Sequence, residues 1–448
     1  MQRPLPACWE VYVMERREFL ATLEEQIRTK RARPMIRKEM ENHIEDQKKA
    51  FLAEGMTGLE AEAAAVREMG DPVEAGIALD RIHRPRMEWS VLAAVLFISI
   101  LGFALQYAVT LTAYPAGISI QYDILDSGLG KRLAFMLAGI LLMLVICWID
   151  YTFLNKYAVP LWIFVNVLLI LCILKSPVIN GIPYYLVYVS CLMIPFYVGI
   201  LYHFRGQGFK GLVKSVGFLC TPLVIMLSYC RSSVIFIIGL AGMILIHVAI
   251  YKKWFGERRL LLLGKLWGIL FLTAAVFLSI IFLKTGGRLL ADYQAARIDA
   301  WLHPEKYEEL NYFAQEVEKT GRLVRQEDMH LTINMLQEIK NSYFWLFLFK
   351  YLGTGKGTAL TAMILSFWIF LFHIVSRQKN QFGHMVGLGC VLFLSLETVI
   401  YVGMNFSALP PGTIYMPFIS EGGAFLLISY FYMGILLSVC NNSRVLEK

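Results

Sequence analysis

The feature that most constrains this chain is a series of continuously apolar runs, each close to the thickness of a bilayer core. A core of about 30 Å needs roughly 20 residues of helix. The runs do not alternate as barrel strands do, so they predict helices. We predict ten spans: Trp89–Val109, Arg132–Ile149, Tyr157–Leu174, Tyr184–Tyr202, Val213–Cys230, Ser233–Tyr251, Leu260–Leu283, Thr358–Val375, Gly383–Gly403 and Gly423–Cys440. The predicted fold class is all-α and polytopic, with a small N-terminal cytoplasmic helical bundle.

Charge divides the chain near residue 88. Residues 1–88 hold 15 Lys+Arg and 17 Asp+Glu, which leaves 27 of 42 and 17 of 34 for the remainder. The net charge of +8 is thus −2 for the first part and +10 for the rest, so it does not indicate a nucleic-acid partner. We predict a cytoplasmic prefix domain (1–88), a membrane domain (89–440) and a cytoplasmic tail (441–448).

Short-loop cations predict the orientation of the membrane domain. Ten crossings put both termini on one side, and the excess of Lys and Arg marks the cytoplasmic side. One set of loops and the tail hold twelve such residues, whereas the opposite short loops hold Lys131, Arg132, Lys175 and Arg231. Both termini are therefore expected in the cytoplasm, and the long connection 284–345 outside. That connection carries ten acidic and eight basic residues up to Lys340, and a loop of this length is usually functional or disordered.

The prefix domain carries explicit helix signals. We expect helices at Met14–Arg33 and Met35–Ala53, a third opened by a Thr57–Glu60 capping box and ended at Gly70, and a fourth from Asp71-Pro72 to about His83. The runs Glu41–Asp46 and Met69–Pro72 resemble the small prefix domain found ahead of bacterial permeases. That resemblance implies a regulatory or interaction module; the alternative is a solvated bundle without a specific partner.

A stretch broken by proline and glycine leads into the last helix. It contains Ala408–Thr413, Met416–Ser420 and Gly422-Gly423. Irregular backbone at membrane depth is tolerated only where protein or a water-filled cavity satisfies its polar groups. The stretch therefore predicts a cavity wall, although a plain interhelical turn fits the composition alone. The residues expected to line the cavity are Pro410, Pro417, Ser420, Gly422 and Gly423.

This stretch resembles the signature of the SEDS family, the shape, elongation, division and sporulation proteins that include FtsW, RodA and SpoVE. Ile149-Asp150-Tyr151, Asn180-Gly181 and Leu352-Gly353 agree with other family positions, and the resemblance covers about residues 90–440. It implies a protein of the bacterial cell membrane that polymerises lipid II, the undecaprenyl-pyrophosphate-linked disaccharide, in peptidoglycan assembly. It also implies a class B penicillin-binding protein transpeptidase as partner, besides the membrane lipids.

The outer loop departs from the family pattern. The family's catalytic aspartate falls at Tyr307, so Glu308 or Glu309 is the candidate base, with a solvated helix face as the alternative. Lys350-Tyr351 replaces paired glutamates before the eighth span, which weakens the case for a divalent cation. No cofactor is certain; a divalent cation is possible.

One carboxylate lies within a predicted span. Placing the charged Glu397 side chain there costs about 2.5 kcal/mol or more unless it pairs with a cation or contacts water. We expect it to line an outward-facing cavity for a lipid-linked pyrophosphate, paired with Arg231 or Lys350; a protonated Glu397 bonded to a neighbouring helix is the alternative.

Three functions stay open on the sequence. The first is an enzyme, a peptidoglycan glycosyltransferase serving division, cell shape or sporulation. The second is a non-catalytic relative acting as a scaffold for lipid II or a transpeptidase. The third is a transporter of a lipid-linked substrate.

Overall fold

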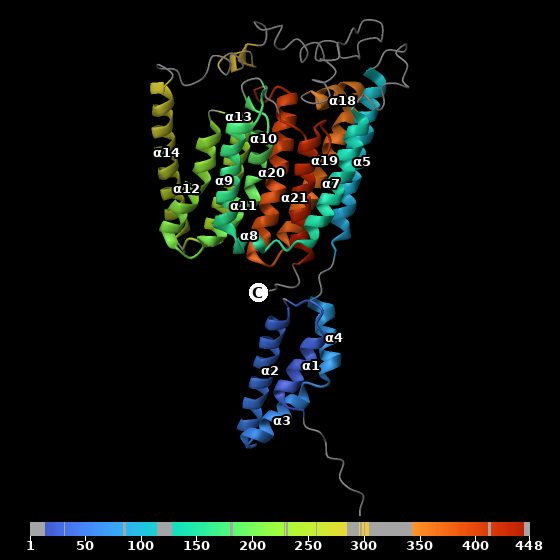
Figure 1. The fold of residues 1–448 in the computed structure, drawn as a ribbon, viewed down its shortest axis with the longest axis vertical. Coiled ribbons are helices and arrows are strands. Elements are labelled where there is room, and N and C mark those ends of the chain that lie inside the picture. Colours follow the sequence, from blue (N-terminus) through green and yellow to red (C-terminus); the bar gives the residue numbers. More distant parts are fainter. Residues whose placement is uncertain are drawn as a thin grey trace, which may run out of the picture. The chain divides into compact units, whose positions relative to one another are not determined.

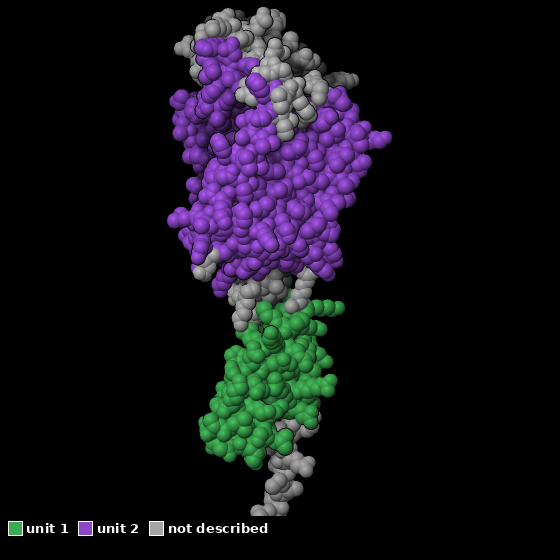
Figure 2. Space-filling view, turned by 90° about the vertical axis from the view of Figure 1, so that its left-hand side faces the viewer, with its two compact units in different colours: residues 1–87, 441–448 green, residues 88–440 purple. Residues whose placement is uncertain are grey.

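The computed structural model describes residues 14–30, 32–83, 87–113, 128–179, 182–227, 229, 232–256, 258–284, 295, 298–299, 301–303, 343–410 and 414–442. The chain divides into two compact units, drawn in different colours in Figure 2. One contains Met1–Met87 and Asn441–Lys448, and the other is Glu88–Cys440. The roles predicted for these parts stay predictions.

The first unit is a four-helix bundle. It consists of α1 (Arg16–Gln26), α2 (Arg33–Ala53), α3 (Gly58–Glu68) and α4 (Pro72–His83), seen in Figure 1. Its small core includes Phe19, Leu23, Ile27, Ile36 and Ile44, all almost completely buried.

The helices of the bundle begin and end close to the predicted residues, with one exception. Thr57 and Glu60 form the capping box of α3: the Thr57 hydroxyl donates to the Glu60 carboxylate at 2.8 Å, and the Thr57 backbone N–H donates to it at 3.3 Å. The predicted end of the first helix at Arg33 is wrong. The chain becomes extended at Ile27, and the next residue, Arg28, donates its N–H to the Asp80 carboxylate at 2.9 Å. A tertiary bond to α4 thus replaces the continuation of α1.

The second unit contains ten helices in its described part that are long and apolar enough to cross a membrane, which confirms the predicted number and the all-α class. The fourth span is two helices broken at Leu192, and the fifth begins at Gly208 rather than Val213. The spanning helices are α5 (Trp89–Ala113), α7 (Leu129–Trp148), α9 (Ala158–Lys175), α10 (Leu186–Cys191) with α11 (Met193–His203), α12 (Gly208–Leu227), α13 (Ser232–Tyr251), α14 (Arg259–Lys284), α19 (Thr354–Ser376), α20 (Gln381–Asn405) and α21 (Gly423–Asn441).

Short elements join the spans. They are α8 (Phe153–Lys156), the antiparallel pair β1 (Val178–Ile179) and β2 (Ile182–Pro183), and α18 (Phe344–Leu352). The two strands flank the predicted Asn180-Gly181 loop motif, which lies outside the described residues. We call the end of this unit where α20 stops and α21 starts the signature end, and the other the opposite end.

Burial identifies the centre of the membrane unit. The α20 and α21 spans are 78% and 72% buried, whereas only 11% of the most apolar stretch of α14 is buried. Figure 1 shows α20 and α21 in the middle of the unit and α14 at its edge. The two central helices flank the signature stretch, so the fold places that stretch at the best packed part of the unit.

Small residues bring α7 against α21. A Cβ on Gly434 would lie 2.9 Å from the carbonyl oxygen of Met143 and 2.8 Å from the Cβ of Ile146, and a Cβ on Gly139 would overlap the Tyr430 ring. Glycine at such positions lets membrane helices approach closely. This contact fixes the start of α7 beside the signature stretch.

The corner after α7 also attaches to α21. The Ser438 hydroxyl donates to the carbonyl oxygen of Ile149 at 2.5 Å and accepts from the backbone N–H of Tyr151 at 3.1 Å. The Tyr151 ring is buried and stacks on Phe382 of α20, with centroids 5.7 Å apart. The isoleucine-aspartate-tyrosine corner therefore ties three segments together at the opposite end.

Candidate functional site

The signature stretch is a buried turn at the signature end. Residues 416–420 are all buried, and Phe418 has φ +64°, a value that is strained for a bulky side chain. A Cβ on Gly102 of α5 would overlap the Phe418 carbonyl oxygen, so a glycine is needed where α5 passes this turn. The strained turn must therefore be held by its neighbours.

Arg132 of α7 holds this turn. One guanidinium nitrogen, Nη1, donates to the carbonyl oxygen of Ser420 at 2.7 Å, and Nη2 donates to those of Phe418 at 2.9 Å and Ile419 at 3.0 Å. Arg132 is 6% exposed, and Gln106 of α5 adds a bond to the Ile419 carbonyl oxygen at 3.0 Å. The planar fork of arginine suits this multiple contact. The sequence predicts Arg132 as the first residue of a span and as a short-loop cation, and does not predict that it holds a turn.

The turn connects to the start of α18 through α20. The Ser420 hydroxyl accepts from the backbone N–H of Met416 at 2.8 Å and interacts with the buried Tyr401 hydroxyl. Asn405 accepts the backbone N–H of Leu346 at 3.0 Å on its side-chain oxygen. Helix starts expose unpaired N–H groups, which such side chains satisfy. Ser420, Tyr401 and Asn405 thus join the signature turn to α18 in one polar network.

Glu421 is a carboxylate that the sequence reading missed. It directly follows the turn, is only partly buried and interacts electrostatically with Arg132. A Cβ on Gly128, the N-cap of α7, would lie 2.5 Å from its Oε1, so Glu421 also faces the positive end of α7. No local pattern marks it; only the contact between α7 and the turn shows that it belongs to the site.

The long connection after α14 meets the signature end at Trp301. The Trp301 indole N–H donates to the carbonyl oxygen of Ser407, which has φ +56°, at 2.8 Å. Two residues further on, the His303 Nε2 lies 3.9 Å from the Asp299 carboxylate. The candidate bases Glu308 and Glu309 lie outside the described residues.

The cavity residues predicted from the sequence have different outcomes. Pro417 and Ser420 are buried in the turn. A Cβ added to Gly422 would lie 3.3 Å from the Tyr415 ring, and one added to Gly423 would lie 2.5 Å from the Cε2 of Phe135. Pro410 is half-buried before the turn. These positions lie on one stretch, and whether they line a substrate cavity stays a prediction.

Glu397 is 6% exposed in α20, and no hydrogen bond or ion pair joins it to another described residue. It interacts electrostatically with Tyr432 of α21. Arg231 and the side chain of Lys350 are outside the described part, so their pairing with Glu397 stays a prediction. Within that described part, no group of three His, Cys, Asp or Glu residues is placed to hold a metal ion.

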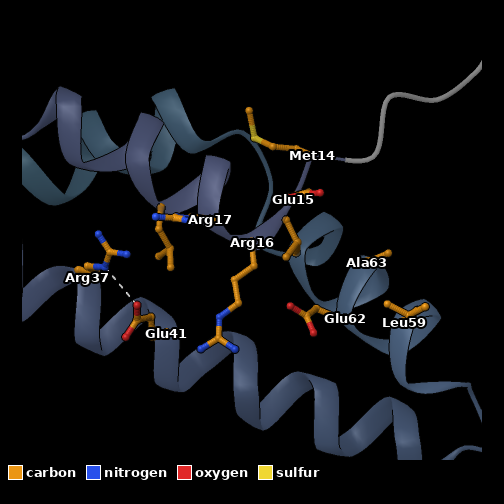
Figure 3. A pocket seen from close by; sticks show the side chains of 11 residues that line it. Met14, Glu15, Arg16, Arg17, Arg37, Glu41, Leu59, Glu62 and Ala63 are labelled. Atoms are coloured by element: carbon orange, nitrogen blue, oxygen red, sulfur yellow. Dashed lines mark hydrogen bonds and ion pairs between the residues drawn. The ribbon is translucent and has the colours of Figure 1, made fainter.

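The bundle has its own cavity, of about 550 Å³, between α1, α2 and α3. Figure 3 shows Arg37 directed at Glu41, with which it pairs at 3.1 Å, and Leu59 on the far side; Leu59 is 86% exposed. Hydrogen bonding to Glu41 raises the pKa of Arg37. The charges that line the cavity balance: Arg16, Arg17 and Arg37 against Glu15, Glu41 and Glu62.

Sequence comparisons connect the membrane unit to cell-wall proteins. The FtsW/RodA/SpoVE family, described as "Cell cycle protein", matches residues 347–445. The probable peptidoglycan glycosyltransferase FtsW of Trichlorobacter lovleyi is 24% identical over 350 residues, covering 69% of this chain and 83% of that protein. The FtsW proteins of Nitrosomonas europaea and a Geobacter species are each 29% identical, over 22% and 24% of this chain. The chain spans only 27% and 32% of the length of these two relatives.

Solved structures share the fold. A chain of a peptidoglycan synthase complex that coordinates polymerization and crosslinking superposes with a TM-score of 0.61 at 16% identity, over 80% of this chain and 98% of that one. RodA, the rod shape determining protein of Thermus thermophilus, gives a TM-score of 0.50 at 14% identity, over 79% and 96%. The fold and the signature turn define a polytopic membrane protein. Residues 347–445 match the FtsW/RodA/SpoVE family, and the membrane unit is similar to FtsW in sequence and to RodA in fold.

Proposed function

We propose that this protein is a peptidoglycan glycosyltransferase that polymerises lipid II at the signature end of its membrane unit. The observation that carries the proposal is the bond from the Trp301 indole to the Ser407 carbonyl oxygen, because it attaches the outer loop beside the signature turn. Glu308 follows Trp301 by seven residues, and an extended chain spans at most about 3.6 Å per residue, so Glu308 is tethered within about 25 Å of Trp301.

The proposed reaction joins two lipid-linked saccharides. Glu308 or Glu309 removes the proton from the acceptor hydroxyl as its oxygen bonds to the anomeric carbon of the donor. The bond from that carbon to the pyrophosphate breaks, and undecaprenyl pyrophosphate leaves with the electron pair. Cationic groups that stabilise the departing charge lower the barrier. The signature turn, held by Arg132, provides a rigid wall for this geometry.

We assign the pyrophosphate to the region of Glu397, Arg231 and Lys350. An almost fully buried carboxylate without a described partner is costly unless a cation or water satisfies it. The double charge reversal Glu397→Arg with Arg231→Glu should restore stability lost in each single variant. A double variant no more stable than either single one contradicts the pairing.

The deciding experiment supplies labelled lipid II to the purified full chain, with and without a class B penicillin-binding protein. We expect polymer on a gel, with Glu308→Gln or Glu309→Gln reducing it by about 100-fold or more, as loss of a general base does. Glu316→Gln in the same loop is the matched control and should leave polymerisation unchanged. Polymer formed by the variant that carries both substitutions overturns the assignment of Glu308 and Glu309. Absence of polymer under every condition overturns the proposal that the protein is an enzyme.

The second candidate is a non-catalytic relative that binds lipid II or the transpeptidase. Tyr307 at the position of the family's aspartate favours it, since a one-residue shift of the base costs rate. Binding of lipid II without polymer would support this scaffold.

We propose a membrane orientation with both termini in the cytoplasm and the signature end outside, which the distribution of short-loop cations supports. We further propose the bundle as a regulatory module. A chain beginning at Met87 should retain polymerisation but lose its modulation by cytoplasmic factors, measured in spheroplast membranes with and without cytosol. An identical response of both chains contradicts that role.

A further inference from the structure

Two loops at the opposite end form one surface. They join α11 to α12 and α13 to α14, and the backbone N–H of Gly206 in the first donates to the carbonyl oxygen of Trp254 in the second at 2.8 Å. Trp254 also donates its indole N–H to Gln381, at the start of α20, at 3.0 Å. The two loops and the first turn of α20 are therefore fixed to each other.

This surface is strongly basic. Residues 203–214 and 251–265 contain eight Lys or Arg and one acid, Glu257, which gives 8 − 1 = +7. Glu257 itself lies outside the described residues. A field of one sign at a membrane boundary attracts the opposite charge.

Aromatic rings hold two of these cations, Arg205 and Arg259, in place. The Arg205 guanidinium lies 5.4 Å from the Tyr202 ring centre and 5.9 Å from that of Trp254. Arg259 lies 4.6 Å from the Tyr251 ring centre. Rings fix the position of a cation without neutralising its charge. The cations are thus pre-arranged but still need an anion.

Several polar groups on this surface lack a partner. None of Arg205, Lys252 and Arg259 forms an ion pair with a carboxylate in the part of the chain that the structure describes. Lys252 is half-buried and interacts electrostatically with His384 of α20, and burial lowers the pKa of its ammonium group. The Nε of Arg259 and the Nδ1 of His384 are buried with no hydrogen-bond partner. Buried polar atoms are normally satisfied, so the Arg259 Nε and the His384 Nδ1 can pair with a further polar group at this surface.

We infer that this surface, which we call the basic site, binds the phosphate headgroup of an anionic phospholipid, with Arg205, Lys252 and Arg259 as its ligating cations. A headgroup phosphate offers several acceptor oxygens and a negative charge at the depth where the helices end. Its acyl chains meet the exposed apolar residues of α14, such as Leu260 (87%) and Phe271 (79%). The inference is independent of the polymerase proposal.

An orientation signal alone would explain cations at this end, but not their fixed positions over rings or the unpartnered nitrogens. A free phosphate fits the charge but not the adjoining apolar helix. The acidic residues of the bundle are the other possible source of negative charge, and the experiment separates them.

The test uses native mass spectrometry of the full chain in detergent, titrated with phosphatidylglycerol. The variant Arg205→Gln/Lys252→Gln/Arg259→Gln should lose roughly 10- to 100-fold in apparent affinity. The matched control, Lys131→Gln/Lys175→Gln/Lys356→Gln, removes three exposed cations from the signature end and should lose less than twofold. Phosphatidylcholine with the same acyl chains should bind weakly to all three proteins.

The unfolding temperature in phosphatidylcholine nanodiscs shows whether the triple variant is folded; if it is not, the single variant Lys252→Gln should lose about fivefold. Equal losses in variant and control, or no loss in either, overturn the inference. If glycerol phosphate displaces all of the bound lipid, the proposal that the basic site prefers a phospholipid to a free phosphate is overturned. Altered hydrogen exchange in residues 16–83 of the variant, with lipid binding unchanged, assigns the site to the bundle instead.

Discussion

Replacing Arg132 by methionine tests the central structural element of the site. The substitution preserves the helix and most of the volume but removes all three bonds to the carbonyl oxygens of Phe418, Ile419 and Ser420. A buried polar group left without its partner costs about 1–3 kcal/mol. Gln106 still donates to the Ile419 oxygen, so the oxygens of Phe418 and Ser420 are the two left without a described donor.

The net destabilisation follows from two opposing terms. Two unsatisfied oxygens cost about 2–6 kcal/mol, and relief of the strained φ of Phe418, once its restraint is lost, offsets about 1 kcal/mol of that cost. The variant no longer buries a charged guanidinium, whose desolvation costs several kcal/mol in the wild-type protein, and this gain offsets part of the loss. We expect Arg132→Met to lower the free energy of unfolding by about 3 kcal/mol, a factor of roughly 100 in the unfolding equilibrium.

The measurement is reversible unfolding in mixed micelles titrated with dodecyl sulphate, followed by tryptophan fluorescence. Lys131→Met is the matched control, because Lys131 is the adjacent residue and is exposed; it should change the free energy by less than about 0.5 kcal/mol. Arg132→Lys should lie between the two, since an ammonium group cannot reproduce the planar fork. A loss below about 1 kcal/mol for Arg132→Met would refute the view that this arginine holds the signature turn.

Three further predictions follow from described contacts. Asn405→Ala should destabilise the start of α18 by about 1 kcal/mol, seen as faster hydrogen exchange there, because it removes a capping acceptor. Trp301→Phe should reduce polymerisation several-fold without changing the unfolding temperature, whereas an unchanged rate would show that the bond to Ser407 does not position the loop. The hydrogen bond from Lys48 lowers the pKa of Glu62 in the folded bundle. The Lys48–Glu62 pair therefore stabilises the bundle fully above the pKa that Glu62 has in the unfolded chain, and this stabilisation is lost as the pH falls through the folded-state pKa of Glu62. Because Glu62 is partly exposed, the loss should be below about 1 kcal/mol and absent in Lys48→Met, as judged by bundle hydrogen exchange between pH 6 and 3.

Recognition of the family from the sequence rested on local signals. The proline- and glycine-rich stretch before the last helix, and the order of the other motifs, required no knowledge of tertiary contacts. What those motifs do became visible only in the structure: Ser438 ties the Ile149–Tyr151 corner to α21, and Arg132 ties α7 to the turn.

The sequence by itself determined the ten spans and most of the bundle, because apolar length, helix caps and glycine stops act within a few residues of each other. Tertiary structure decided the site. Arg132 and the oxygens it binds are 286–288 residues apart, and Trp301 and Ser407 are 106 residues apart. Such bonds depend on the close packing of α7 on α21 and on long-range contacts between Trp301 and the signature end. No local pattern encodes those distances, so a charge that looked like part of a loop proved to be the buried support of the signature turn.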